Sequence, residues 1–279
     1  MSFLKSKRFQ ALITALFFVI LYIRHEYNIS QEFYLVGYEK TDISSLIRNE
    51  ELTDKDYDTI FKNTGVSPKS AEKFIEDGNY GVLDELNDLY FKKPEIERVF
   101  VAHPVTVGER NAKQIAPVVD LKNGDVLVTF NTHTLDWRHG HCALVIDAEK
   151  GILLEHMSIG NPSCLTSVDG WGRYPGFVVL RYPDEKVAQE AVNYAVEHLI
   201  GIDYNILAGV IKKDKSDEKI PESSHCSHIV WQAYKAVGVD IDETGGIFVT
   251  PENIAMSEKL DVLQIYGLNP KDYKSRLAK

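Results

Sequence analysis

The stretch Pro221-Glu-Ser-Ser-His-Cys-Ser-His-Ile-Val-Trp-Gln-Ala-Tyr-Lys-Ala-Val-Gly238 predicts a helix that carries a cysteine in its first turn. Ser223 or Ser224 can cap the start of this helix, and Gly238 can end it. The free N–H groups and the dipole at a helix start favour the thiolate, which is the nucleophilic form of cysteine. Cys226 is therefore a candidate nucleophile, and the alternative is a buried and inert thiol.

A reactive cysteine needs a base that is close in space but not in sequence. The run His141-Cys-Ala-Leu-Val-Ile-Asp147 predicts a strand that begins at a histidine. A histidine at the start of a strand can face a cleft while the strand holds it in place. His141 is therefore the candidate base, and His139, two residues earlier, competes for this role because it shares the same face.

A second strand is predicted over Gly151-Ile-Leu-Leu-Glu-His-Met157, which forms a hairpin with the first. Glu155 in this strand can accept a hydrogen bond from the imidazole and so fix its tautomer and orientation. His156 is the alternative, because adjacent strand residues face opposite sides of a sheet.

Other apolar runs extend this mixed pattern of strands and helices. Strands are predicted within 118–130 and over 177–182, and helices over 185–200 and 225–237. Residues 29–98 contain only short, charged helical patterns, so we interpret them as a helical lead-in that packs on the main domain or spaces it from a membrane.

The N-terminus combines basic residues, among them Lys5 and Arg8, with an apolar run over 11–23 that Arg24 closes. This run is shorter than the roughly 20 residues of a spanning helix and suits a signal sequence. No small-residue cleavage site follows it, so a retained signal anchor over 1–28 is predicted. Basic residues before the run place the rest of the chain outside the cytoplasm, on a single-pass cell-membrane protein. A buried helix of a soluble protein is the alternative.

Composition restricts the partners. The chain has 279 residues and a formal net charge of −10, and no basic face is visible, so a nucleic-acid partner is not expected. Three scattered cysteines make neither a disulfide framework nor a zinc motif, although Cys142 and Cys164 could pair. His133, His139 and His141 alternate as metal ligands can, but no carboxylate accompanies them at a useful spacing. We expect no metal and no cofactor.

Four segments taken together resemble the permuted branch of the NlpC-type cell-wall cysteine hydrolases, and most closely the YiiX/YaeF-like papain-fold group. They are Gly124-Asp-Val-Leu, His141-x-Ala-Leu-Val-Ile-Asp, Leu153-Leu-Glu-His and His225-Cys-Ser-His-Ile-Val-Trp-Gln-Ala-Tyr. In the permuted branch the order is histidine, polar residue, cysteine, and this chain has that order. The resemblance covers about residues 115 to 265, including the late Thr250-to-Leu260 segment.

The resemblance implies an α+β fold in which a permuted papain-like antiparallel sheet packs against helices over 99–279. It also implies roles: Cys226 matches the nucleophile, His141 the base and Glu155 the third polar residue. Tyr204, in Gly201-Ile-Asp-Tyr-Asn205, resembles a tyrosine that lines the cleft of that group, although a tyrosine between two helices can equally be core.

The function expected from the resemblance and the topology is hydrolysis of an amide bond in a peptidoglycan peptide. One alternative is a lipid-directed acyl hydrolase or acyltransferase, and another is a catalytically silent wall-binding module. A deep apolar groove beside the cysteine would favour a lipid, and a narrow polar one would favour a peptide.

Overall fold

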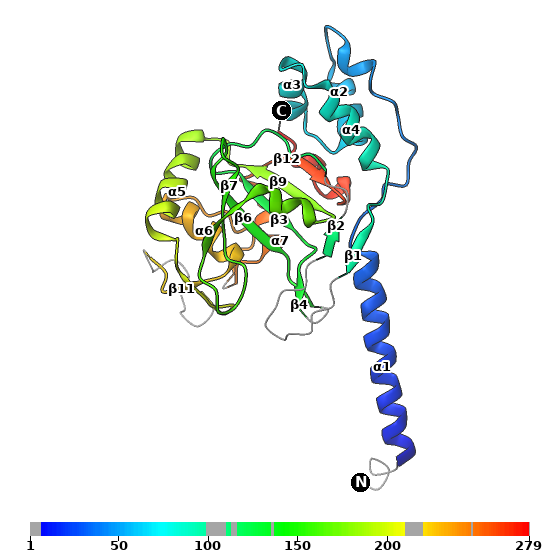
Figure 1. Ribbon diagram of the computed structural model, residues 1–279, viewed down its shortest axis with the longest axis vertical. Helices are drawn as coiled ribbons and strands as arrows, with labels where there is room; N and C mark the ends of the chain where they lie inside the picture. Colours follow the sequence, from blue (N-terminus) through cyan, green and yellow to red (C-terminus); the bar gives the residue numbers. More distant parts are fainter. Residues whose placement is uncertain are drawn as a thin grey trace.

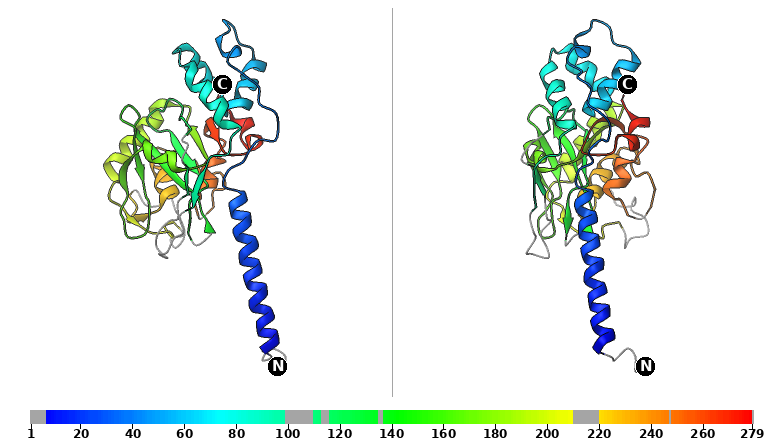
Figure 2. Two further views of the ribbon diagram at one scale, coloured as in Figure 1. Left: turned by 45° about the vertical axis from the view of Figure 1, so that its right-hand side comes forward. Right: turned by 90° about the vertical axis from the view of Figure 1, so that its right-hand side faces the viewer.

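The computed structural model describes residues 7–98, 110–112, 116–134, 137–209, 220–246 and 248–278. A long N-terminal helix, α1 (Lys7–Ser30), projects away from a mixed α+β body (Figures 1 and 2). The body is a sheet with helices packed against it, as the sequence predicts.

The central sheet has six strands, and every pairing in it is antiparallel. In spatial order the strands are β12 (Asp261–Tyr266), β9 (Phe177–Arg181), β3 (Val126–Thr129), β6 (His141–Asp147), β7 (Ile152–Glu155) and β8 (Cys164–Ser167). Gly124 makes the turn into β3 with a φ of +89°, and a Cβ there would lie 2.7 Å from the Cβ of Ala188. Glycine is therefore required for this turn.

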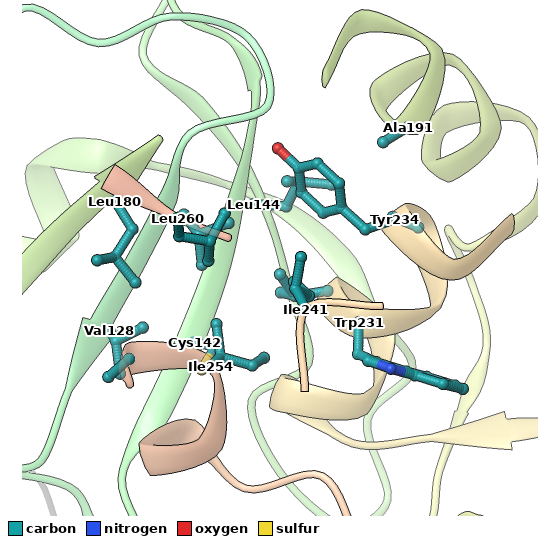
Figure 3. Close-up of a cluster of buried hydrophobic side chains, with 14 of the residues drawn as sticks. Val128, Cys142, Leu144, Leu180, Ala191, Trp231, Tyr234, Ile241, Ile254 and Leu260 are labelled. Carbon is teal, nitrogen blue, oxygen red and sulfur yellow. The ribbon is translucent and has the colours of Figure 1, made fainter. Parts of the chain in front are cut away.

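One face of the sheet packs against α5 (Glu185–His198), α6 (Cys226–Ala236) and α7 (Pro251–Ala255). Alternate strand residues such as Val128 and Leu144 point into this core, where they meet the buried face of α6 (Figure 3). This core fixes α6 against the middle of the sheet, and so fixes the position of the first residue of that helix.

The other face shares a second core with α2 (Asp54–Thr64), α3 (Pro68–Glu76) and α4 (Tyr80–Tyr90). A backbone hydrogen bond also joins the sheet to these helices: the Ser67 N–H, just before α3, donates to the Leu263 carbonyl of β12 at 2.8 Å. The helical lead-in is therefore packed on the sheet.

The remaining elements are short. Three two-stranded ladders and four 3₁₀ helices complete the described chain: β1 (Ile96–Arg98) with β2 (Arg110–Ala112), β4 (His133–Thr134) with β5 (Trp137–Arg138), β10 (Asp203–Tyr204) with β11 (Ser223–Ser224), η2 (Leu46–Arg48), η3 (Val168–Arg173), η4 (Pro270–Asp272) and η5 (Lys274–Arg276).

The apolar helix is longer than the run over 11–23 that the sequence suggested. α1 has 24 residues, and its stretch Phe9–Tyr27, with 19 residues and a mean hydropathy of 1.4, is long and apolar enough to cross a bilayer. None of this stretch is buried against the body, which also argues against the buried-helix alternative. A signal sequence meets the same length and hydropathy criteria.

Candidate active site

Cys226 is the first residue of α6, and His225 caps this helix. The ring of His225 accepts a hydrogen bond from the His228 N–H at 3.4 Å, so the prediction of Ser223 or Ser224 as the cap is wrong. Ser224 lies instead in β11, and its hydroxyl contacts the His228 ring at 3.0 Å. The sulfur therefore lies at a helix start, as predicted, but His225 caps this helix in place of a serine.

His141 is the first residue of β6, and its imidazole lies between a thiol and a carboxylate. Its Nε2 contacts Glu155 Oε1 at 2.8 Å, which leaves Nδ1 for the hydrogen bond with the Cys226 side chain. His139, the competing candidate, uses its own Nδ1 to contact the Gly140 carbonyl at 2.9 Å. The three residues Cys226, His141 and Glu155 therefore form one continuous buried row.

Glu155 is held by more than His141. Its Oε1 also accepts the indole N–H of Trp171 at 3.0 Å, and its Oε2 accepts the hydroxyl of Thr166. Trp171 in addition stacks on the His141 ring, with centroids 5.9 Å apart and planes 23° apart. A carboxylate with three donors is fixed in orientation and stabilised in its charged form.

The contacts within this row shift the pKa values of His141 and Cys226. Burial alone would lower the pKa of His141, but hydrogen bonds and charge attraction from Cys226 and Glu155 outweigh burial and raise it to about 10. Burial would raise the pKa of Cys226, but the His141 ring and the backbone N–H groups of Cys142 and Ser227 lower it. Both shifts favour a thiolate beside an imidazolium.

His156 faces away from Glu155, as the alternation of a strand requires. Its ring makes an edge contact with Tyr204 at 4.9 Å between centroids, and burial, more than any charge, lowers its pKa to about 4. His156, Tyr204, Thr132 and Cys226 line a small cavity beside the thiol. Glu155, and not His156, is thus the residue that contacts the His141 ring.

Tyr204 lies beside the sulfur, at the junction of β10 with β11, and lines both this cavity and the larger groove described next. Burial, followed by the negative charge of Cys226, raises the pKa of Tyr204, so its hydroxyl stays protonated. The resemblance implied a place for Tyr204 at a cleft, with the core as the alternative, and its side chain lines the groove beside Cys226.

A groove of about 860 Å³ opens beside Cys226. Its lining combines apolar side chains, among them Phe130, Phe248 and Leu268, with charged ones, Arg138, Glu252 and Asp272. Tyr27 and Ser30 of α1 also line it. The walls of this groove cannot be predicted from the sequence, because they come from distant parts of the chain.

The remaining expectations about metals and disulfides concern residues around the row. Cys142, Cys164 and Cys226 are all free, so the alternative disulfide between Cys142 and Cys164 is not formed. Within the described ranges, no three His, Cys, Asp or Glu side chains are grouped to hold a metal, and His133, His139 and His141 do not form such a group.

Comparisons with protein-family models, with curated proteins and with solved structures find no match to this chain.

Proposed function

We propose that this chain is a membrane-anchored cysteine hydrolase in which Cys226 attacks the carbonyl carbon of an amide or ester. The observation that supports this most is the buried row from Cys226 through His141 to Glu155. A nucleophile, a base and an orienting acceptor in hydrogen-bond contact are what acyl transfer requires. Selection for stability alone does not account for the row, because buried ion pairs are weak stabilisers.

In the first half of the reaction, the Cys226 thiolate adds to the carbonyl carbon and forms a tetrahedral oxyanion. The N–H groups at the start of α6, including that of Cys226, are candidate donors to this oxyanion. The protonated His141 then gives its proton to the leaving amine or alkoxide as the carbon–nitrogen or carbon–oxygen bond breaks. The product that stays on the enzyme is a thioester of Cys226.

In the second half, the neutral His141 accepts a proton from water as the oxygen adds to the thioester carbon. Breakage of the carbon–sulfur bond releases the carboxylic acid and restores the thiolate and the imidazolium. Glu155 keeps the same ring nitrogen of His141 protonated throughout, so the other nitrogen remains available for both transfers. Tyr204 is proposed to contact the substrate.

The fold and topology form part of the proposal. The sheet packed against α6 agrees with a permuted papain-like arrangement over 99–279, and α1 agrees with a single-pass anchor. The basic residues before the apolar run favour a body outside the cytoplasm.

Two substrate classes follow from this chemistry. A peptidoglycan peptide is the class implied by the sequence resemblance. A lipid acyl group is the second, and the aromatic side chains Phe33, Phe130 and Phe248 in the groove lining favour it. A catalytically silent wall-binding module is the competing class, and it requires an unreactive Cys226.

The test is the rate at which iodoacetamide alkylates each cysteine as a function of pH, in the wild type and in His141→Ala. We expect Cys226 to be labelled rapidly below about pH 8.5, the ordinary pKa of a cysteine, because it is already a thiolate there. In His141→Ala the labelling should move to higher pH. Cys164, which is exposed and has a raised pKa, serves as the internal control.

Slow labelling of Cys226 with the same pH profile in both proteins would contradict the proposal. It would leave the wall-binding module as the better interpretation.

A further inference from the structure

His225 is a side chain of the site to which the proposed reaction assigns no part. It stands directly before Cys226 in the chain and lines the same groove. The residue is buried, with 3% of its surface exposed, and its ring stacks on Phe248 with centroids 5.1 Å apart and planes 18° apart. The imidazole is therefore held in one orientation at the wall of the groove.

The cap of α6 determines which nitrogen of the His225 ring carries the proton. The His228 N–H donates to Nδ1 of His225 at 3.4 Å, and a backbone N–H can only donate. Nδ1 is therefore unprotonated, and the proton of the neutral ring is on Nε2. Burial, and then repulsion by His228 and His156, lower the pKa of His225 to about 3, so the ring stays neutral around pH 7.

The Nε2–H of His225 is a buried donor at the wall of the groove. Nε2 has no hydrogen-bond partner within the described part of the chain. A buried N–H without an acceptor costs stability, so each such group in a folded protein calls for an explanation. Next to a candidate nucleophile, the explanation that we favour is an acceptor supplied by the substrate.

The start of α6 has few backbone N–H groups to offer to an oxyanion. Among the first three, the Ser227 N–H faces the Cys226 sulfur and the His228 N–H is bonded to His225. The N–H of Cys226 itself is the third. Oxyanion holes commonly combine such a backbone N–H with a second donor, and a histidine side chain can be that donor.

We infer that His225 donates its Nε2–H to the carbonyl oxygen of the substrate and, together with the N–H of Cys226, stabilises the oxyanion of the tetrahedral intermediate. This inference rests on the proposed function. A neutral imidazole at a helix N-terminus suits the role, because it polarises a carbonyl and keeps its own proton.

The hydrogen bond from His225 follows the charge on the substrate oxygen. As the Cys226 thiolate adds to the carbonyl carbon, the electron pair of the C=O double bond moves to the oxygen, and the hydrogen bond becomes charge-assisted and stronger. When the bond to the leaving group breaks, that pair re-forms the carbonyl. His225 transfers no proton in this step, and His141 remains the residue that does.

The test compares two reactions of Cys226 in the full-length protein, only one of which forms an oxyanion. Iodoacetamide reacts with the thiolate at a saturated carbon, whereas para-nitrophenyl butyrate is attacked at its carbonyl carbon. His225→Ser removes the imidazole donor and keeps a residue that can cap the helix. His228→Ser is the matched control, because His228 is nearly as buried (4% against 3%) and its side chain is not among those that line the groove.

We expect His225→Ser to lower kcat and kcat/KM for the ester equally, by about 100-fold, since this is the effect of removing one oxyanion donor. Alkylation of Cys226 should change by less than about threefold, because the thiolate and its contact with His141 remain. His228→Ser should keep the wild-type ratio of the two rates. His225→Thr, which can also cap the helix, is measured in parallel, and circular dichroism checks the folding of each variant.

Equal losses of ester turnover and alkylation in His225→Ser would mean that His225 only supports the helix start, and they would overturn the inference. An unchanged kcat, with or without a higher KM, would overturn it too, as would the same change of ratio in His228→Ser. In these cases rapid alkylation and ester turnover by the wild type leave the proposed function standing. Slow alkylation of wild-type Cys226, with the ordinary pH profile of a thiol, would overturn both.

Discussion

Cys142 and Cys226 are two buried thiols in one site with opposite chemistry. Cys142 follows His141 in β6 and points into the core between the sheet and α6, among the apolar side chains of Figure 3. Burial, and then the negative charge of Cys226, raise its pKa well above the ordinary value. Cys226 is nearly as buried, yet its pKa is lowered.

The difference between the two thiols lies in what each one contacts. Cys226 faces the imidazolium of His141 and two backbone N–H groups, one of which belongs to Cys142 itself. The Cys142 side chain lies among apolar neighbours and next to a negative charge. Burial penalises both thiolates, so the partner of each sulfur decides its protonation state. The reactivity that we propose for Cys226 therefore depends on its contact with His141 and, through it, with Glu155.

The largest effect should come from removing the Cys226 thiol, and removal of the Cys142 thiol is the matched comparison. Cys226→Ala is expected to reduce hydrolysis of para-nitrophenyl butyrate by at least about 10⁴-fold, since the nucleophile is lost. Cys142→Ala removes a sulfur of similar burial without removing the nucleophile. It should lose stability, by about 1 kcal/mol for the small cavity, and keep most of the turnover. Equal loss of turnover in both variants would show that the two thiols do not differ as described.

The hairpin that carries His141 and Glu155 shows how far the sequence predicts the site. Short apolar runs predicted both strands, and the resemblance suggested the roles of His141 and Glu155. The register was beyond prediction, because the pairing shifts between Val145 and Asp147 and places Glu155 opposite Ala143. Glu155 reaches His141 diagonally, as neighbours two residues apart on one face can. A residue pair across a bulge cannot be fixed by spacing alone.

Two strands of the sheet escaped prediction for physical reasons. β12 contains Gln264, a polar residue whose buried side chain donates to the Pro117 carbonyl and accepts the Val119 N–H. Such a buried amide breaks the apolar pattern while remaining satisfied by hydrogen bonds. β8 is an edge strand with mostly exposed residues, so it carries little apolar signal.

The partners of Glu155 were missed for the same kind of reason. Thr166 lies in β8 and Trp171 in the 3₁₀ helix that follows it, and only the folded sheet brings them to the carboxylate. The indole N–H of Trp171 donates to Glu155 at 3.0 Å, a contact that no local pattern in the sequence indicates.

An intermediate effect is expected from Glu155→Gln, which removes charge while the geometry can be kept. Glutamine can turn its oxygen to His141 and Trp171 and its amide to the hydroxyl of Thr166. Without the carboxylate the pKa of His141 should fall from about 10, and the pKa of Cys226 should rise. The pH range of the thiolate–imidazolium pair therefore narrows from both sides, and turnover at neutral pH should fall by about 10- to 100-fold.

The measurement for Glu155→Gln is the full pH profile of turnover and of Cys226 alkylation. Glu149→Gln, an exposed change in the turn of the same hairpin, is the charge-matched control and should leave the profile in place. An alkaline limit that stays near pH 10 in Glu155→Gln would mean that Glu155 does not set the pKa of His141.

The smallest effect is expected from Trp171→Phe, and it separates positioning from stability. Trp171 and Trp231 are both buried and both donate the indole N–H to a carboxylate, Trp171 to Glu155 at 3.0 Å and Trp231 to Asp240 at 2.8 Å. Phenylalanine at either position removes one hydrogen bond to a charged group and should lower the free energy of unfolding by about 1–3 kcal/mol. Of the two carboxylates, Glu155 contacts His141 and Asp240 does not belong to the row. We therefore expect only Trp171→Phe to change the rate of Cys226 alkylation, by about threefold, and to shift its pH profile. If Trp231→Phe changes that profile equally, the indole of Trp171 contributes to stability and not to the orientation of the row.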